Sequence, residues 1–141
     1  MSDEASKLTG GCLCGAVKIE VTGPPHIAAN CHCLSCQKLS GTGHAFHLMF
    51  AEDAVSITGE TKGYTWTADS GNEVTTHFCP NCGSPLFGRS TGYPGSLTIR
   101  AAALDDTSGF SPQASVYAKR LQSWDTTAEG APAFPEMPPA E

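Results

Sequence analysis

Alternation of apolar and polar residues, rather than long apolar runs, is the main pattern along this chain. Residues 16–21 alternate and stop at a Gly-Pro-Pro sequence, which predicts a strand followed by a break. Residues 45–50 place Phe46, Leu48 and Phe50 on one face of a second strand. Similar stretches predict further short strands at residues 54–58, 62–67, 74–78, 86–89 and 96–102. The chain is therefore predicted to be mainly β.

Helical signals are short and few. Residues 34–40 and 115–120 are the two stretches that favour a helical turn. The length of 141 residues suits one domain, which we place at residues 8–129. We expect a flexible N-terminus at residues 1–7 and a Pro-rich tail at residues 130–141 that packs on the domain or frays from it.

Charge and hydropathy exclude two classes of partner. The formal net charge is −6, and the eight Lys and Arg residues are spread along the chain. Nucleic-acid binding is not expected, because no basic cluster could follow a phosphate backbone. A membrane partner is not expected either, because no stretch reaches the roughly 18 apolar residues of a membrane span. The polar N-terminal residues do not resemble a signal peptide, so we expect a cytoplasmic location.

Seven cysteines are the strongest chemical signal, and they fall into three clusters. In a reducing compartment they favour metal binding over disulfides, and an odd number also fits disulfides poorly. We name the clusters the N-terminal pair, the middle cluster and the knuckle. They are Cys12 and Cys14; Cys31, Cys33 and Cys36; and Cys79 and Cys82.

The knuckle has the sequence Cys-Pro-Asn-Cys-Gly, which is typical of a zinc-binding turn. Pro80 sets the turn, and Gly83 is expected in the left-handed conformation that lets two thiolates converge. Because a knuckle supplies two ligands, a second pair must complete a tetrahedron. Spacing alone allows the N-terminal pair to join the knuckle, or to join Cys31 and Cys33 and leave Cys36 with the knuckle. We favour the first arrangement, because the middle cluster is close enough in sequence to hold one ion.

A metal ion with three protein ligands keeps a fourth position for another molecule. Three thiolates make zinc a weaker Lewis acid than three neutral imidazoles do, so this site is less suited to making hydroxide. It is better suited to binding a thiol, whose pKa falls below its free value of about 8.5 on the metal. His32, His44 or His47 would close the site if one of them were the fourth ligand. Both ions would then be structural, and the protein would be an interaction module.

The cysteine clusters and the residues around them resemble the glutathione-dependent formaldehyde-activating (GFA) family. The resemblance extends over almost the whole chain and ends near residues 137–139. Its specific parts are residues 11–15 (GCLCG), 31–38 (CHCLSCQK), 77–87 (HFCPNCGSPLF), 104–106 and 111–113.

This resemblance implies a β-tent fold, in which layered antiparallel sheets are pinned by zinc. It implies two zinc ions and a reaction that joins glutathione to formaldehyde, giving S-hydroxymethylglutathione. Members are classed as carbon–sulfur lyases, because the reverse reaction breaks that bond. The implied ligands are Cys12, Cys14, Cys79 and Cys82 for a structural zinc, and Cys31, Cys33 and Cys36 for a catalytic zinc.

The resemblance departs at Gln37, where many members of the family have Arg. Arginine binds a carboxylate in bidentate fashion, whereas glutamine offers no charge to the carboxylates of glutathione. The expected partners are a small-molecule thiol and an electrophile, and a non-catalytic carrier of thiol adducts is the alternative. No oligomeric state is predicted. The candidates for supporting the site or moving a proton are His32, Gln37, Lys38, His44 and His47.

Overall fold

The computed structural model describes residues 7–138, and the chain divides into two compact units. Within the described part, the first unit combines residues 7–26 with 48–107, and the second combines residues 27–47 with 108–138. The N-terminal segment predicted to be flexible lies outside the described residues, apart from Lys7. The last three residues of the predicted tail also lie outside them, and the single domain at residues 8–129 stays a prediction.

A small antiparallel sheet of the first unit has the strand order β1-β2-β5. In β2, Ile19 and Val21 are buried while Lys18 and Glu20 are exposed, which is the alternation that the sequence predicts. The neighbouring strand β1 lacks such alternation, and its residues pair one by one with those of β2. The strand bounds are Lys7–Gly11 for β1, Lys18–Thr22 for β2 and Val55–Thr58 for β5.

Glycine is required where β5 ends. Gly59 has a φ of 109°, and a Cβ atom built on it would lie 2.3 Å from the carbonyl oxygen of Ala16. This close approach is closed to residues with a side chain, and the dihedral angle is unfavourable for them as well. Gly71 has a similar φ of 91°, but a Cβ atom there would meet nothing within 4 Å.

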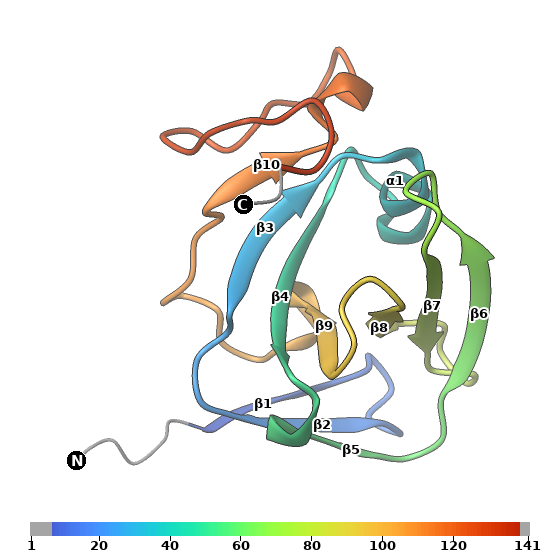
Figure 1. The fold of residues 1–141 in the computed structure, drawn as a ribbon. Coiled ribbons are helices and arrows are strands. Elements are labelled where there is room, and N and C mark those ends of the chain that lie inside the picture. Colours follow the sequence, from blue (N-terminus) through green and yellow to red (C-terminus); the bar gives the residue numbers. More distant parts are fainter. Residues whose placement is uncertain (1–6, 139–141) are drawn as a thin grey trace. The chain divides into compact units, whose positions relative to one another are not determined.

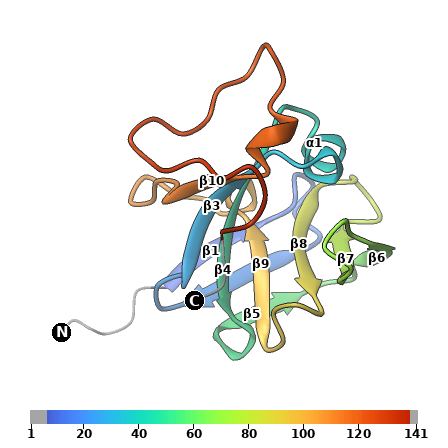
Figure 2. The same cartoon turned by 45° about the horizontal axis from the view of Figure 1, so that its top comes forward.

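Four strands of the first unit follow one another as antiparallel neighbours in the order β9-β8-β7-β6. Figure 1 shows β6 and β7 side by side, and Figure 2 shows β8 beside β9. Leu86 and Ile99 are fully buried, and each contributes roughly 1.5–3 kcal/mol of hydrophobic stabilisation. The bounds are Lys62–Thr67 for β6, Glu73–Phe78 for β7, Pro85–Ser90 for β8, Ser96–Arg100 for β9, and Glu52–Ala54 and Ala101–Ala103 for the 3-10 turns η1 and η2.

The second unit contains the strands β3 and β10 and the helix α1. The strand β4 begins in this unit and continues into the first, where Leu48 and Phe50 are fully buried. The pair β3 and β10 is parallel, with Ser115 opposite Asn30, and the two strands lie side by side in Figures 1 and 2. The bounds are Ile27–Cys31 for β3, Leu34–Ser40 for α1, Ala45–Ala51 for β4, Ala114–Val116 for β10 and Ala118–Arg120 for the 3-10 turn η3.

The chain after residue 130 runs beside β10 (Figure 2). The backbone N–H of Ser115 donates to the carbonyl of Pro132 at 2.9 Å, and the N–H of Phe134 donates to the carbonyl of Ser115 at 2.8 Å. The N–H of Ala118 then donates to the carbonyl of Phe134 at 2.9 Å. Within the second unit, residues 132–134 are therefore held by backbone hydrogen bonds to β10 and the turn after it.

The predicted mainly β fold is confirmed, and the helix at residues 34–40 is confirmed as α1. The predicted helical turn at residues 115–120 is instead the end of a strand followed by a 3-10 turn. The parallel pairing of β10 also differs from the antiparallel sheets that the resemblance implies. No helix among residues 7–138 is long and apolar enough to cross a membrane.

Candidate metal centres

Two segments of the first unit bring four cysteines together. Cys12 and Cys14 follow β1, and Cys79 and Cys82 occupy the turn between β7 and β8. The Sγ atoms of Cys12 and Cys14 are 3.6 Å apart, and those of Cys14 and Cys79 are 3.8 Å apart. All four sulfur atoms lie within 4.8 Å of one another, and all are free thiols. We call these residues the four-cysteine group.

The turn geometry explains how the knuckle presents its sulfur atoms. Gly83 has a φ of 81°, as predicted, and its N–H donates to the carbonyl of Cys79 at 2.8 Å. This close turn places Cys82 next to Cys79. The side chain of Asn81 then donates from Nδ2 to Cys14 Sγ at 3.2 Å, so the knuckle also contacts the N-terminal pair.

Hydrogen bonds favour the ionised form of Cys12 and Cys82, whereas the pKa of Cys79 is raised, despite its backbone hydrogen bonds, by burial and by the contacts with Cys12 and Cys82. The backbone N–H of Val17 donates to Cys12 Sγ at 3.2 Å, and that of Asn81 donates to Cys79 Sγ at 3.4 Å. The hydroxyl of Ser84, 3.2 Å from Cys82 Sγ, lowers the pKa of Cys82 to about 5. Thiolates are the form that binds metal.

The donor set of the four-cysteine group fits zinc. Zinc–sulfur bonds of about 2.3 Å at tetrahedral angles separate two sulfur ligands by about 3.8 Å. The distances of 3.6 and 3.8 Å between sulfur atoms match that edge. Four thiolates would complete the coordination of such an ion.

The middle cluster forms a second group, which lies in the second unit. Cys31 is the last residue of β3, and Cys33 is the N-cap of α1. The backbone N–H of Cys36 donates to Cys33 Sγ at 3.4 Å, so the start of the helix orients two of the three side chains. The three sulfur atoms lie within 4.8 Å of one another. We call these residues the three-cysteine group.

Charge is shared unequally in the three-cysteine group. Hydrogen bonds from the thiols of Cys31 and Cys36 lower the pKa of Cys33 to about 2. The hydrogen bond with Cys33 in turn raises the pKa of Cys31 to about 12. The pKa of Cys36 is also raised, because of its hydrogen bonds with both neighbours and its burial. Negative charge in the group is therefore concentrated on Cys33.

Soft sulfur donors at this spacing also suit zinc, and the group supplies three of them. His47 Nε2 lies 3.4 Å from Cys36 Sγ, which is hydrogen-bond distance for a pair that includes sulfur. Of the residues predicted to support this site, His47 contacts a sulfur atom directly. Lys38 lies exposed in the last turn of α1.

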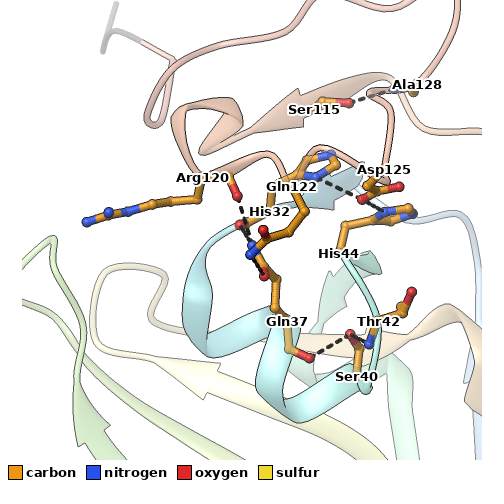
Figure 3. Close-up of polar contacts among 10 residues, drawn as sticks. All are labelled: His32, Gln37, Ser40, Thr42, His44, Ser115, Arg120, Gln122, Asp125 and Ala128. Carbon is orange, nitrogen blue, oxygen red and sulfur yellow. Dashed lines mark hydrogen bonds and ion pairs between the residues drawn. The ribbon is translucent and has the colours of Figure 1, made fainter.

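Gln37 uses its side-chain amide to join α1 to the segment after β10. Its Nε2 donates to the carbonyl of His32 at 2.8 Å and to the carbonyl of Arg120 at 3.0 Å. Its Oε1 accepts from Gln122 Nε2 at 2.7 Å. Figure 3 shows the amide between these groups. Both donor hydrogens and the acceptor oxygen of Gln37 are therefore engaged within the protein.

His32 and His44 face Asp125 (Figure 3). His44 Nδ1 lies 2.8 Å from Asp125 Oδ2, and His32 Nδ1 lies 3.4 Å from the same oxygen. Burial and the neighbouring His44 lower the pKa of His32, whereas Asp125 acts in the opposite direction. Burial acts to raise the pKa of Asp125, but its hydrogen bond with His44 outweighs this and lowers it.

Sequence reasoning placed the cysteines in these two groups but missed several of the residues around them. Asn81 and Ser84 lie within the knuckle sequence, so their polar side chains were a usable signal. Asp125 lies 81 residues from His44 in a loop without any motif, so the sequence offers no signal for it.

Two comparisons with known proteins match this chain. A family profile described as "Glutathione-dependent formaldehyde-activating enzyme" matches residues 7–120. The crystal structure of a Rhodobacter sphaeroides protein superimposes with a TM-score of 0.56 at 21% sequence identity. That match covers 70% of this chain and 89% of the other, and it supports the fold alone.

Proposed function

We propose a zinc-dependent thiol chemistry for this chain, which belongs to the family of glutathione-dependent formaldehyde-activating enzymes. It would be a carbon–sulfur lyase-type enzyme that adds a thiol such as glutathione to formaldehyde or a related electrophile. The observation that carries the proposal is the three-cysteine group, whose three sulfur donors converge within 4.8 Å at the start of α1. Three protein donors leave room for an exogenous thiol on the same ion.

The two cysteine groups would have different roles. Cys31, Cys33 and Cys36 would hold the catalytic zinc, which supplies a positive charge that binds the incoming thiol in its thiolate form. The four-cysteine group would hold a structural zinc, because its own sulfur atoms complete a tetrahedron. Such a closed site contributes to folding rather than to chemistry.

The addition is balanced without an oxidant or a reductant. A bond forms between the thiol sulfur and the carbonyl carbon, and the thiol proton ends on the former carbonyl oxygen. His47 is a side chain that could carry this proton, because its Nε2 lies 3.4 Å from Cys36 Sγ. An imidazole has one ring nitrogen that can accept a proton and one that can donate one, which suits both accepting and returning a proton.

Cobalt substitution tests whether a thiol binds at the three-cysteine group. The absorption spectrum of cobalt-loaded protein is recorded before and after addition of glutathione. Growth of the thiolate charge-transfer bands is expected, because a further sulfur joins the metal. The Cys36→Ser variant should lose this response, whereas the neighbouring Ser35→Ala variant should keep it. An unchanged wild-type spectrum at saturating glutathione would contradict glutathione as the thiol.

Turnover separates an enzyme from a carrier. Thiols and aldehydes combine spontaneously, so the rate of adduct formation must exceed the rate without protein. We expect a clear excess for wild type and none for Cys36→Ser. Thiol binding without any acceleration would favour the non-catalytic carrier. The proposal places this chemistry in the cytoplasm, where thiols are kept reduced.

A further inference from the structure

We propose that His32, His44 and Asp125 form a third metal site, which takes a divalent first-row transition ion such as zinc through two nitrogen donors and one oxygen donor. One ligand atom from each residue lies within 4.8 Å of the others. The three side chains come from separate segments of the second unit and converge on one point (Figure 3). This site contains no cysteine, and it is separate from the chemistry proposed for the three-cysteine group.

The buried ring of His32 is the first argument for a ligand. His32 is fully buried, and within the described part of the chain neither of its ring nitrogens makes a hydrogen bond of good geometry, although the backbone of Gly43 and the carboxylate of Asp125 lie near the ring. A buried polar atom without a good partner is destabilising. A metal ion would provide one ring nitrogen with a partner, and neutral imidazole is the form that binds metal.

The spacing of the donor atoms is the second argument. His32 Nδ1 lies 3.4 Å from Asp125 Oδ2 and makes no hydrogen bond with it. This is too long for a good N–H···O bond, but it is the separation of two ligands on one zinc ion. Bonds of about 2.0–2.1 Å at tetrahedral angles put neighbouring N and O ligands about 3.3 Å apart. His44 Nδ1, 2.8 Å from the same oxygen, would move away slightly as both atoms turned to the ion.

A missing side chain at position 43 is the third argument. Gly43 is buried, and a Cβ atom built on it would lie 2.3 Å from Asp125 Oδ2 and 2.7 Å from its Cγ. Any other residue would therefore push the carboxylate away from the two imidazoles. Asp125 reaches His32 and His44 because position 43 is glycine.

The donor chemistry identifies the class of ion. Two imidazoles and a carboxylate suit borderline divalent ions such as zinc, cobalt(II) or iron(II), whereas soft ions prefer thiolates. An ion with these three protein ligands would keep a fourth position for water or another small ligand.

Metal counting with cobalt spectroscopy tests the proposal. Untagged protein is titrated with cobalt(II), and bound metal per chain is measured after removal of free ion. Wild type is expected to bind three equivalents, of which two raise the sulfur-to-cobalt charge-transfer absorption. The third should add d–d absorption without any charge-transfer increase, because its ligands contain no sulfur.

Three variants locate the third ion. Asp125→Asn and His44→Gln should each lose one equivalent while keeping the charge-transfer bands unchanged. Gly43→Ala keeps all three ligands, but it should weaken the affinity for the same cobalt equivalent at least tenfold, because the added methyl group displaces the carboxylate of Asp125. His26→Gln, which removes an exposed histidine, is the matched control and should bind as wild type does.

The wild-type titration alone can overturn the proposal, even if a variant fails to fold. If every cobalt equivalent bound at saturation has sulfur ligands, then the cluster of His32, His44 and Asp125 is a hydrogen-bond network without metal. Equal metal content in wild type and folded Asp125→Asn would lead to the same conclusion. Neither outcome affects the thiol chemistry, because that is measured through the charge-transfer bands and their response to glutathione.

Discussion

Replacing Gln37 with methionine should destabilise the protein more than its position on a short surface helix suggests. Methionine has a similar length and shape but can neither donate nor accept the bonds made by the amide. Those bonds are three contacts of 2.7–3.0 Å, of which two join α1 to Arg120 and Gln122 after β10 and one reaches the carbonyl of His32 just before α1. The substitution therefore separates the hydrogen bonding of residue 37 from its packing.

The magnitude follows from the number and exposure of these bonds. An intramolecular hydrogen bond contributes about 0.5–1.5 kcal/mol net. Two of the three lie in part-buried surroundings and one is exposed, so the exposed bond contributes near the lower end. We expect Gln37→Met to lower the free energy of unfolding by about 2–3 kcal/mol. Gln122→Met removes one bond of the same set and should cost about 1 kcal/mol.

Urea denaturation at a fixed zinc concentration measures both values. The midpoint should fall in the order wild type, Gln122→Met, Gln37→Met, with the same dependence of free energy on urea. The stability of the double variant should lie within a few tenths of a kcal/mol of that of Gln37→Met, because the bond between the two side chains is already lost in the single variant. The reasoning is refuted if Gln37→Met costs no more than Gln122→Met. It is also refuted if the two losses add fully.

Three further predictions concern the thiols and the backbone. Cys82→Ser should lose the ion of the four-cysteine group and most of the fold's stability. In zinc-finger peptides such an ion contributes an apparent binding free energy of about 10–16 kcal/mol to folding. Metal content and thermal melting measure the two losses. Gly59→Ala should cost more than 2 kcal/mol, and Gly71→Ala, which has a similar φ but open space, only about 1–2 kcal/mol in urea denaturation. The raised pKa values of the Cys31 and Cys36 thiols mean that zinc must displace about two protons from this group. Its zinc affinity should therefore rise with pH through the neutral range, as measured by competition with a chromophoric chelator; a flat profile would show that both thiols are already ionised.

Local patterning allowed much of the fold to be predicted. The alternation of residues 16–21 predicted β2 because one face of that strand is buried and the other is exposed. The strand β1 was missed because its sequence, Lys-Leu-Thr-Gly-Gly, has no alternation, and its conformation depends on pairing with β2. The short strand β10 was missed for the same reason, since its pairing partners are distant in the sequence.

The cysteine groups were predictable because metal ligands that act together sit at short spacings within each cluster. The pairing of the N-terminal pair with the knuckle was favoured from the sequence, because Cys31, Cys33 and Cys36 are close enough to hold one ion, although spacing alone left two arrangements open. Asp125 was beyond sequence reasoning, because its approach to His32 and His44 depends on the path of a distant loop. Gln37 was predicted as a candidate near the site, whereas the structure shows its amide bound to backbone carbonyls and to Gln122.

The four-cysteine group also affects how the chain acquires metal while it is being synthesised. Cys14 and Cys79 are 65 residues apart, so the ribosome releases the N-terminal pair and the middle cluster well before the knuckle. Closing a loop between Cys14 and Cys31 costs about 1 kcal/mol less than closing one between Cys14 and Cys79, because the second loop is longer by about two doublings of length. An ion bound before the knuckle is released would therefore meet only the N-terminal pair and the middle cluster. The N-terminal pair would join its final partners once β7 and the knuckle are complete, so the four-cysteine group would be the last of the two cysteine groups to form.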